Sequence, residues 1–168
     1  LEFNEALEDG PEAVNKDPYG DYALSGSIFL DFRNQADFTD PYSLIYGHHM
    51  EGDYMFGSLH SFLEEDYFQK HKKGELIVGD TTYDLNIFAV MNTEATKDIL
   101  FSPTEYAQKD VIGYIRGHAE RCRKEVADQL SDASQIVALS TCKYPDSVYR
   151  VVVFAEMTNP HPTKTHDN

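Results

Sequence analysis

Ser134-Gln-Ile-Val-Ala-Leu-Ser-Thr-Cys142 is a β-prone, mostly apolar stretch that ends in a cysteine. Such a run predicts a buried strand, whose last residue delivers a thiol to one end of a sheet. The apolar run 149–157 predicts a partner strand, and the Pro-Asp pair at 145–146 is typical of a turn. The two segments therefore form a predicted hairpin that brings Arg150 close to Cys142.

Cys142, Arg150 and His48 are residue types that together support nucleophilic catalysis by a thiol. A nearby guanidinium lowers the pKa of a thiol by stabilising the thiolate, and it can donate hydrogen bonds to an oxyanion. A cysteine nucleophile also needs a proton acceptor, and His48 offers one directly after the apolar run 42–46. His49 is a rival for that role. The structural alternatives are a packed core cysteine, a structural histidine and an arginine on the solvent face.

Metal binding by the His48-His49 pair is disfavoured by the sequence. Adjacent residues of an extended chain point to opposite sides, and no nearby spacing of Cys, His or Asp completes a zinc ligand set. Four acids cluster around this region without EF-hand spacing, which favours a solvated face: Asp37, Asp40, Glu51 and Asp53. We therefore expect no metal and no cofactor.

The composition indicates one acidic globular domain. The chain has 168 residues, 41% of them hydrophobic, and 29 acidic residues against 14 Lys and Arg give a formal charge of −15. This charge argues against a nucleic-acid partner, because the basic stretches 70–73 and 116–124 are short and interleaved with acids. No apolar run approaches the roughly 18 residues needed to cross a bilayer, and no signal peptide opens the chain, so we expect a soluble piece. Cys122 and Cys142 are expected to be free thiols.

The order of elements predicts a mainly β fold with helices, of the α+β class. About seven strands in mostly hairpin-type order favour a closed β-barrel with one long and two short helices outside, rather than a doubly wound parallel sheet. A hairpin is expected around Gly79-Asp80, and short helices over 58–65 and 66–71. We expect an acidic N-terminal arm over 1–20, the folded domain over 21–158 and an exposed tail over 159–168.

The long helix has the clearest predicted start. Ser102 is placed as N-cap, Pro103 at the first helical position, and Glu105 to close a capping box. Apolar residues then follow at three- and four-residue steps from Val111 as far as Val126, a range that includes Cys122. The spacing predicts one continuous helix with Cys122 packed on its apolar face.

Several segments, in this order, resemble the sortases, and class B sortases in particular. The resemblance runs from about Tyr19 to Thr158 and rests on these pieces: Ser25-Gly-Ser-Ile-Phe-Leu-Asp31, Ile45-Tyr-Gly-His-His-Met50, Met55-Phe-Gly57, Phe68-Gln-Lys-His71, and Leu139-Ser-Thr-Cys142 with Arg150. It implies a closed β-barrel cysteine transpeptidase from the outer surface of a Gram-positive bacterium. Such an enzyme cuts a C-terminal sorting signal after threonine, holds the acyl chain as a thioester, and passes it to an amine.

Carried over residue by residue, the resemblance makes Cys142 the nucleophile, His48 the general acid and then base, and Arg150 the group that holds the substrate backbone and oxyanion. Ser140 and Thr141 correspond to substrate-binding positions. The implied partners are a sorting-signal peptide and an acceptor amine, from either a peptidoglycan precursor or a pilin lysine. The long helix before the cysteine strand would wall the peptide groove.

The sequence also departs from the family pattern. Ala138 stands where the family often has threonine, and two further strands and a membrane anchor are expected upstream of the region that matches Tyr19. Residues 1–20 cannot supply those strands, so we expect a truncated or rearranged form with an open sheet edge. Three alternatives stay open: a pilin-polymerising sortase, a cysteine hydrolase that uses water as acceptor, and a remnant that binds without catalysis.

Overall fold

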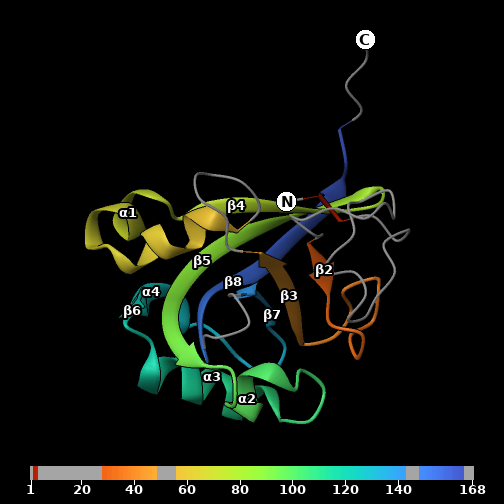
Figure 1. Ribbon diagram of the computed structural model, residues 1–168. Helices are drawn as coiled ribbons and strands as arrows, with labels where there is room; N and C mark the ends of the chain where they lie inside the picture. Colours follow the sequence, from red (N-terminus) through yellow and green to blue (C-terminus); the bar gives the residue numbers. More distant parts are fainter. Residues whose placement is uncertain (1, 4–27, 49–55, 143–147, 165–168) are drawn as a thin grey trace.

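The computed structural model describes residues 2–3, 28–48, 56–142 and 148–164, with the side chains of 2, 3, 48, 57 and 142 left out. The strands are β1 (Glu2–Phe3), β2 (Phe29–Leu30), β3 (Tyr42–His48), β4 (Lys73–Val78), β5 (Thr81–Glu94), β6 (Arg121–Cys122), β7 (Gln135–Cys142) and β8 (Tyr149–Pro162). The helices are the 3-10 helix η2 (Gly57–Leu63), α1 (Glu65–Lys70), α2 (Asp98–Phe101), α3 (Gln108–His118) and α4 (Lys124–Ala127). These elements form one curved sheet with helices packed on its outside (Figure 1).

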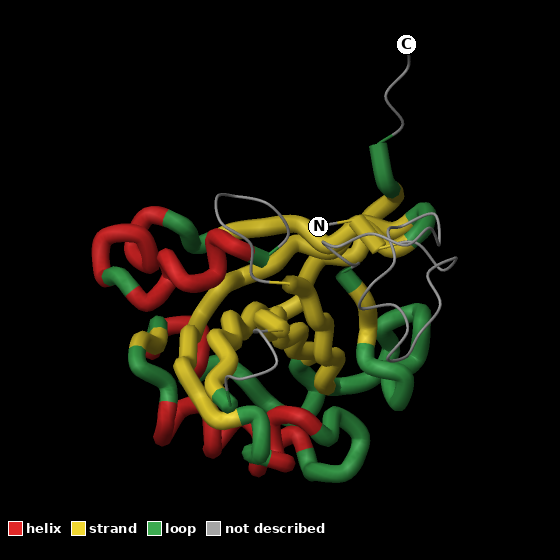
Figure 2. Tube along the Cα trace, viewed as in Figure 1, coloured by secondary structure: helices red, strands yellow, loops and turns green. Residues whose placement is uncertain are grey.

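The strands pair in the order β1-β4-β5-β8-β7-β3-β2, with β6 added to β5. The predicted mainly β fold with outer helices is therefore confirmed. Among the described residues the two ends of this path are not joined, so the sheet is curved like a barrel but is not closed by hydrogen bonds. Figure 2 shows how far β5 bends around the other strands. β5 has a register irregularity against β8 between Ile87 and Ala89, and an irregularity of this kind is typical of a β-bulge, which bends its strand.

The centre of the sheet is the antiparallel pair of β5 and β8, each 14 residues long. β8 continues to Pro162, opposite Thr81, and so includes the first residues of the predicted tail. β4 and β5 form the hairpin predicted around Gly79-Asp80. Gly79 has a φ of 57°, a left-handed conformation that glycine adopts without steric strain.

β3 and β7 pair in parallel, from Tyr42 opposite Ile136 to His48 opposite Cys142. The sequence pattern did not predict this parallel pairing. Buried Gln108, at the start of α3, fixes the entry to both strands. Its side-chain Nε2 donates to the carbonyl of Pro41 at 2.8 Å and to the carbonyl of Ser134 at 2.9 Å. The two strands therefore start in register.

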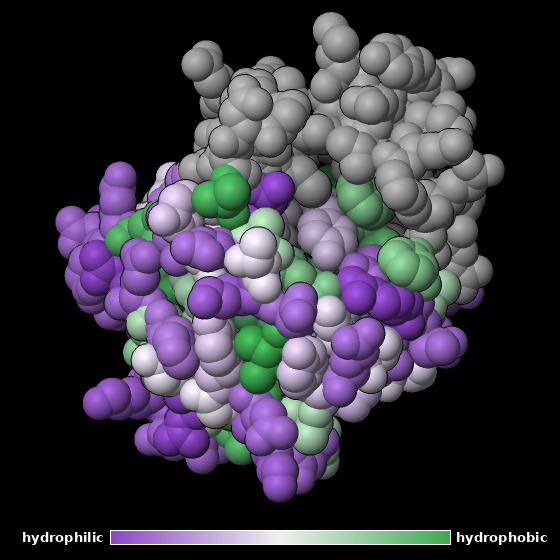
Figure 3. Space-filling model, turned by 60° about the horizontal axis from the view of Figure 1, so that its bottom comes forward, coloured by the Kyte–Doolittle hydropathy of each residue, from purple (hydrophilic) through white to green (hydrophobic). Residues whose placement is uncertain are grey.

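The two faces of the sheet bury separate apolar clusters. One contains Val151 and Val153 of β8 with side chains from η2 and α1, and we call it the η2 cluster. The other contains Val152 and Phe154 with residues of α2, α3 and α4, and we call it the α3 cluster. This alternation is the period of two that a strand imposes. Seen from the side of α2 and α3, the surface over the α3 cluster is mostly hydrophilic (Figure 3).

The predicted long helix is wrong in its bounds. Ser102 is the C-cap of α2, and α3 begins only at Gln108 after an N-cap at Ala107. The helix ends at His118, and Cys122 lies in β6, opposite Ala89. The pairing of β4 with β5 ends at Asn86, followed by one hydrogen bond from the Ile87 N–H to the carbonyl of Lys72, and β6 occupies the same edge at Ala89 and Val90. Cys122 still packs against the α3 cluster, as predicted.

Buried Arg123 follows β6 and secures the bend of β5. Its Nη1 donates to the carbonyl of Ile87 at 2.8 Å, and its Nη2 donates to the carbonyl of Phe68 in α1. Its guanidinium lies 4.0 Å from the centre of the Phe68 ring, in cation–π contact. One side chain thus connects α1, β5 and β6.

Candidate active site

The last residues of β3 and β7 bring two of the predicted catalytic positions together. His48 is the register partner of Cys142 across the parallel pair. Neighbouring strands of a sheet lie about 4.8 Å apart, so two register partners are direct neighbours. The side chains of both residues lie outside the described part of the structure. The two positions are nevertheless adjacent at the same sheet edge.

Strand alternation assigns the three predicted catalytic positions to one face. Leu44, Ala138 and Phe154 belong to the α3 cluster, on β3, β7 and β8 respectively. Steps of two along each strand lead from these residues to positions 48, 142 and 150. All three positions therefore fall on the face of the α3 cluster, just beyond its buried part. They lie on three strands that are hydrogen-bonded neighbours.

Arg150 is near the start of β8, opposite Thr93 of β5. Its side chain is half-buried, and its Nη1 donates to the carbonyl of Tyr149 at 3.0 Å. β8 stays joined to β7 at Val151, whose N–H donates to the hydroxyl of Thr141 at 3.1 Å. Val151 follows Arg150 in β8, and Thr141 precedes Cys142 in β7. The hydrogen bond between Val151 and Thr141 therefore holds Arg150 close to the end of β7.

Ser140 and Thr141, the predicted substrate-binding residues, are both fully buried. The Thr141 hydroxyl is engaged with the backbone of Val151, as described above, and the Ser140 hydroxyl lies 3.3 Å from the carbonyl of Thr141. The Thr141 hydroxyl therefore helps to join β7 to β8, whereas the Ser140 hydroxyl contacts its own strand. Substrate contact by these residues stays a prediction.

A hollow of about 390 Å³ lies beside Arg150, where β5 and β8 pass α3. It is lined by Met91, Asn92, Thr93, Glu94, Lys97, Tyr114, His118 and Tyr149. The Tyr114 and His118 rings stack on one side of it, with centroids 4.1 Å apart, and Tyr149 is exposed. The C-terminal half of α3 thus contributes two rings to this hollow, and the role of the helix as the wall of a peptide groove stays a prediction.

A buried carboxylate ties the strand that carries His48 to its surroundings. Asp31 is only 4% exposed and accepts hydrogen bonds from Nε and Nη2 of Arg33, both at 2.9 Å. The Tyr46 hydroxyl donates to the same carboxylate at 3.0 Å, two residues before His48. Burial raises the pKa of Asp31, but the hydrogen bonds from Arg33 and Tyr46 outweigh it and hold the pKa below its usual value.

Sequence reasoning missed this group of Asp31, Arg33 and Tyr46. The only signal was an acid two residues before an arginine at the end of a short apolar strand. Arg33 also reaches the carbonyl of Phe101 at 2.5 Å and so connects β2 and β3 to α2. The group thus ties β3, two residues before His48, to β2 and α2.

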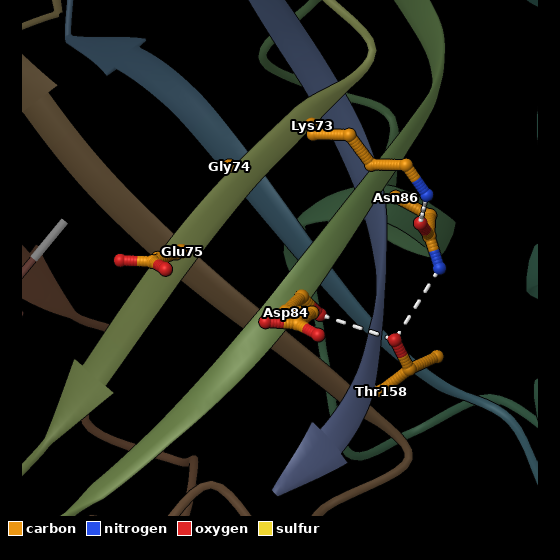
Figure 4. A pocket seen from close by; sticks show the side chains of 6 residues that line it. All are labelled: Lys73, Gly74, Glu75, Asp84, Asn86 and Thr158. Atoms are coloured by element: carbon orange, nitrogen blue, oxygen red, sulfur yellow. Dashed lines mark hydrogen bonds between the residues drawn. The ribbon is translucent and has the colours of Figure 1, made fainter. Parts of the chain in front are cut away.

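A second, polar hollow of about 760 Å³ lies on β4, β5 and β8 (Figure 4). Its lining includes Lys73, Asn86 and Thr158; Asn86 accepts a hydrogen bond from Lys73 and donates to Thr158 at 3.3 Å. It lies toward the start of β7, because Gln135 is opposite Met157, the neighbour of Thr158. Cys142 is the last residue of β7, so this hollow is at the opposite end of the strand.

Cys122 provides an internal contrast to Cys142. It is half-buried in β6, and burial raises the pKa of its thiol above the ordinary value. A raised pKa means less thiolate at neutral pH and slower reaction with electrophiles. Cys122 is therefore a useful reference thiol.

Within the described ranges, no three His, Cys, Asp or Glu side chains form a metal-binding group. Asp40, one of the acids considered above, is engaged by the Asn34 side chain at 2.9 Å and the Gln35 N–H at 2.7 Å. In those same ranges, no helix is both long and apolar enough to span a membrane.

Comparisons with known proteins identify the family to which this fold belongs. The chain belongs to the sortase family, because the model of the sortase domain matches residues 11–158. It is 34% identical over 121 residues to sortase B of Listeria monocytogenes. The matched region is 71% of this chain and 48% of that protein. It is 30% identical over 149 residues to sortase B of Staphylococcus aureus. The matched region is 86% of this chain and 59% of that protein.

A solved structure of a Streptococcus pyogenes class B sortase involved in pilus biogenesis has a TM-score of 0.79 and 34% sequence identity. It covers 92% of this chain and 84% of that one. The resemblance to class B sortases predicted from the sequence is therefore confirmed. The chain spans about half the length of the curated relatives it matches. Members of the family act as cysteine transpeptidases on the surface of Gram-positive bacteria.

Proposed function

We propose that this chain is the catalytic part of a class B sortase, which cleaves a C-terminal sorting signal after threonine and joins the new carboxyl end to an amine. The observation that carries the proposal is the register of β3 and β7, which pairs His48 with Cys142. Arg150 lies on the neighbouring strand, at a position on the same face. Nucleophile, acid–base group and oxyanion donor are the three parts that acyl transfer by a thiol needs.

In the first half-reaction the Cys142 thiolate attacks the carbonyl carbon of the threonine. The Arg150 guanidinium donates hydrogen bonds to the oxygen, which gains negative charge. The peptide C–N bond then breaks, and the His48 imidazolium gives its proton to the departing amine. The products are a thioester on Cys142, a neutral His48 and the released C-terminal peptide.

In the second half-reaction an amine attacks the thioester carbonyl. His48 takes a proton from the attacking nitrogen, the C–S bond breaks, and Cys142 leaves as a thiolate. The enzyme thus returns to its starting thiolate and imidazolium. Amine transfer requires that the amine reach the thioester faster than water does.

The hollow beside Arg150 supports a peptide substrate. It is concave, it contains the stacked Tyr114 and His118 rings, and it adjoins the strand that carries Arg150. A wall of this kind suits an extended peptide whose backbone is held by the arginine. We assign this hollow to the side chains of the sorting signal next to the cleaved bond.

For the acceptor we propose the amine of a peptidoglycan precursor, at the extracellular face of the cell membrane. A second candidate is the lysine amine of a pilin subunit. It is favoured by the similarity to the S. pyogenes class B sortase that is involved in pilus biogenesis. Both acceptors use the same chemistry and differ only in the group that carries the amine.

The test is cleavage of a panel of quenched fluorescent sorting-signal peptides, with and without an oligoglycine or lysine-containing acceptor. We expect the wild-type chain to form an amine-linked product and Cys142→Ala to form none. His48→Ala should reduce kcat/KM about 1,000-fold, and Arg150→Lys about 100-fold. Hydrolysis alone, unchanged by either acceptor, would indicate a peptidase. No cleavage by the folded chain would indicate a form with little activity.

Thiol labelling gives an independent check on the nucleophile. Cys142 should react with iodoacetamide at neutral pH at least ten times faster than Cys122, because burial raises the pKa of the Cys122 thiol. Mass spectrometry of the modified peptides measures both rates in one sample. Equal rates at the two cysteines would contradict an activated Cys142.

A further inference from the structure

Gly47, the residue before His48, has no room for a side chain. A β-carbon at this position would lie 2.6 Å from Cδ2 and 2.8 Å from Cγ of Phe56. Carbon atoms that are not bonded normally stay about 3.5–4.0 Å apart. The Phe56 ring therefore lies directly against the backbone of β3, as close as the absence of a β-carbon allows. Gly74 in β4 differs, since a β-carbon there would make ordinary contacts of 3.7 Å with Leu85.

Phe56 is itself held firmly. Its side chain is only 5% exposed and belongs to the η2 cluster. Its carbonyl accepts a hydrogen bond from the Leu59 N–H at 3.1 Å, at the start of η2. Leu59 and Phe62 anchor that helix in the same cluster. The ring cannot retreat without disturbing the core, because protein interiors are closely packed.

The Phe56 ring lies on the reverse face of the sheet from the predicted catalytic positions. Ile45 and Val137 are in the η2 cluster, so alternation places Gly47 and its register partner Thr141 on that face. The next register pair, His48 and Cys142, falls on the opposite face. The ring thus supports the strand from behind at the residue that precedes the pair.

We propose that Phe56 is a positioning residue for His48. Its ring, seated against Gly47, fixes the last residues of β3 against β7 and so sets the spacing between His48 and Cys142. Gly47 is required because any side chain would push β3 and the ring apart. The inference rests on the proposed acid–base function of His48. A displacement near 1 Å in a reacting pair can reduce a rate about 100-fold.

Gly47→Ala tests the contact, with Gly74→Ala as the matched control. We expect Gly47→Ala to lower kcat of peptide cleavage by between about 10-fold and 100-fold while KM changes less than about threefold. Positioning affects the chemical step more than binding. An unfolded fraction would also lower the apparent kcat at constant KM, so kcat is calculated per folded enzyme. Gly74→Ala should leave both constants within about twofold. Circular dichroism checks that each variant is folded.

Phe56→Leu provides the second variant, because a smaller and more flexible side chain leaves room at position 47. The double variant Gly47→Ala/Phe56→Leu should recover at least fivefold of the kcat lost in Gly47→Ala. Such recovery shows that the two residues act through one contact. Additive losses in the double variant, or a Gly47→Ala enzyme with wild-type kcat, would overturn the proposal.

Alkylation of Cys142 separates this inference from the proposed function. If the wild-type chain cleaves peptides and Gly47→Ala has the same kcat as the control Gly74→Ala, the positioning role fails and the proposed function stands. If no peptide is cleaved, the proposed function fails, and the rate of Cys142 alkylation still decides. Gly47→Ala should then slow alkylation as His48→Ala does, and a Gly47→Ala variant that is alkylated at the wild-type rate overturns the inference.

Discussion

Two regions of the molecule bury an arginine, and they satisfy its charge in different ways. Arg33 has a partly exposed side chain, 28% accessible, and pairs with the almost fully buried carboxylate of Asp31. Arg123 is only 5% exposed and is held by the backbone carbonyls of Ile87 and Phe68. The more deeply buried cation therefore has neutral acceptors, and the more exposed one has the anion.

The difference teaches how each region should respond to its surroundings. Backbone carbonyls near the end of α1 carry partial negative charge and do not titrate, so the region of Arg123 is insensitive to acid. Burial lowers the pKa of Arg123, yet a guanidinium stays charged at neutral pH. The region of Arg33 depends on the ionised Asp31 and therefore weakens as that carboxylate is protonated.

The largest effect is expected for Arg123→Met. This change removes the donors for two buried carbonyls and the cation–π contact with Phe68. We expect the free energy of unfolding to fall by about 3 kcal/mol, since each buried acceptor left without a partner costs about 1–3 kcal/mol. Urea unfolding followed by circular dichroism measures it.

Arg116→Met is the matched control for that prediction. Arg116 is 49% exposed and pairs with Asp128 at the surface. Surface ion pairs typically contribute less than about 1 kcal/mol. A loss for Arg123→Met no greater than for Arg116→Met would show that burial of Arg123 adds nothing to stability.

A smaller, pH-dependent effect is expected for Asp31→Asn, about 2 kcal/mol at pH 7. The pKa of Asp31 is lower in the folded chain than the roughly 3.9 of an unfolded one. Its contribution is therefore complete above about pH 5 and is lost as the pH falls through the folded-state pKa. The difference in unfolding free energy between wild type and Asp31→Asn should accordingly narrow at pH 3.

The exposed Asp37 supplies the comparison for this experiment, because its carboxylate accepts from Thr39 in its own turn. Asp37→Asn should change stability by less than about 0.5 kcal/mol at either pH. A constant gap between wild type and Asp31→Asn from pH 7 to pH 3 would contradict the titration of Asp31.

The smallest effect is expected for Tyr46→Phe, about 1 kcal/mol at pH 7, through loss of its hydrogen bond to Asp31. In an Asp31→Asn background the same change should have less than half of that effect, because the charged acceptor is gone. Tyr42→Phe loses a hydrogen bond to the carbonyl of Leu100 at 2.9 Å. Its effect should be similar in both backgrounds, and thermal unfolding of the three single and two double variants measures both.

Much of the sheet was predictable from the sequence because apolar and β-prone runs mark individual strands. The runs ending at Cys142 and starting at Tyr149 form β7 and β8, and the run 42–46 lies within β3. The period of two also places the candidate catalytic positions on one face once the pairing is known. The pairing of β3 with β7 was not predictable, because no local turn joins the two strands.

The helices show where local signals lose to tertiary contacts. Ser102, Pro103 and Glu105 have the residues of a helix start, yet the Ser102 hydroxyl lies 3.4 Å from Nη1 of Arg33, and the Ser102 N–H bonds to the carbonyl of Asp98. The serine thus ends α2 instead of starting α3. Likewise, an available edge of β5 takes residues 121–122 into a strand, which no helical spacing could indicate.

The parallel pairing of β3 and β7 has a consequence for how the protein acquires activity as it folds. β4 with β5, and β7 with β8, are neighbours in the sequence and can form early as local hairpins. β3 meets β7 only after the whole intervening chain has been brought into place, at a cost in loop-closure entropy. We therefore expect positions 48 and 142 to meet only after the local hairpins have formed, so that the proposed nucleophile stays without its proposed acid–base partner until β3 has paired with β7.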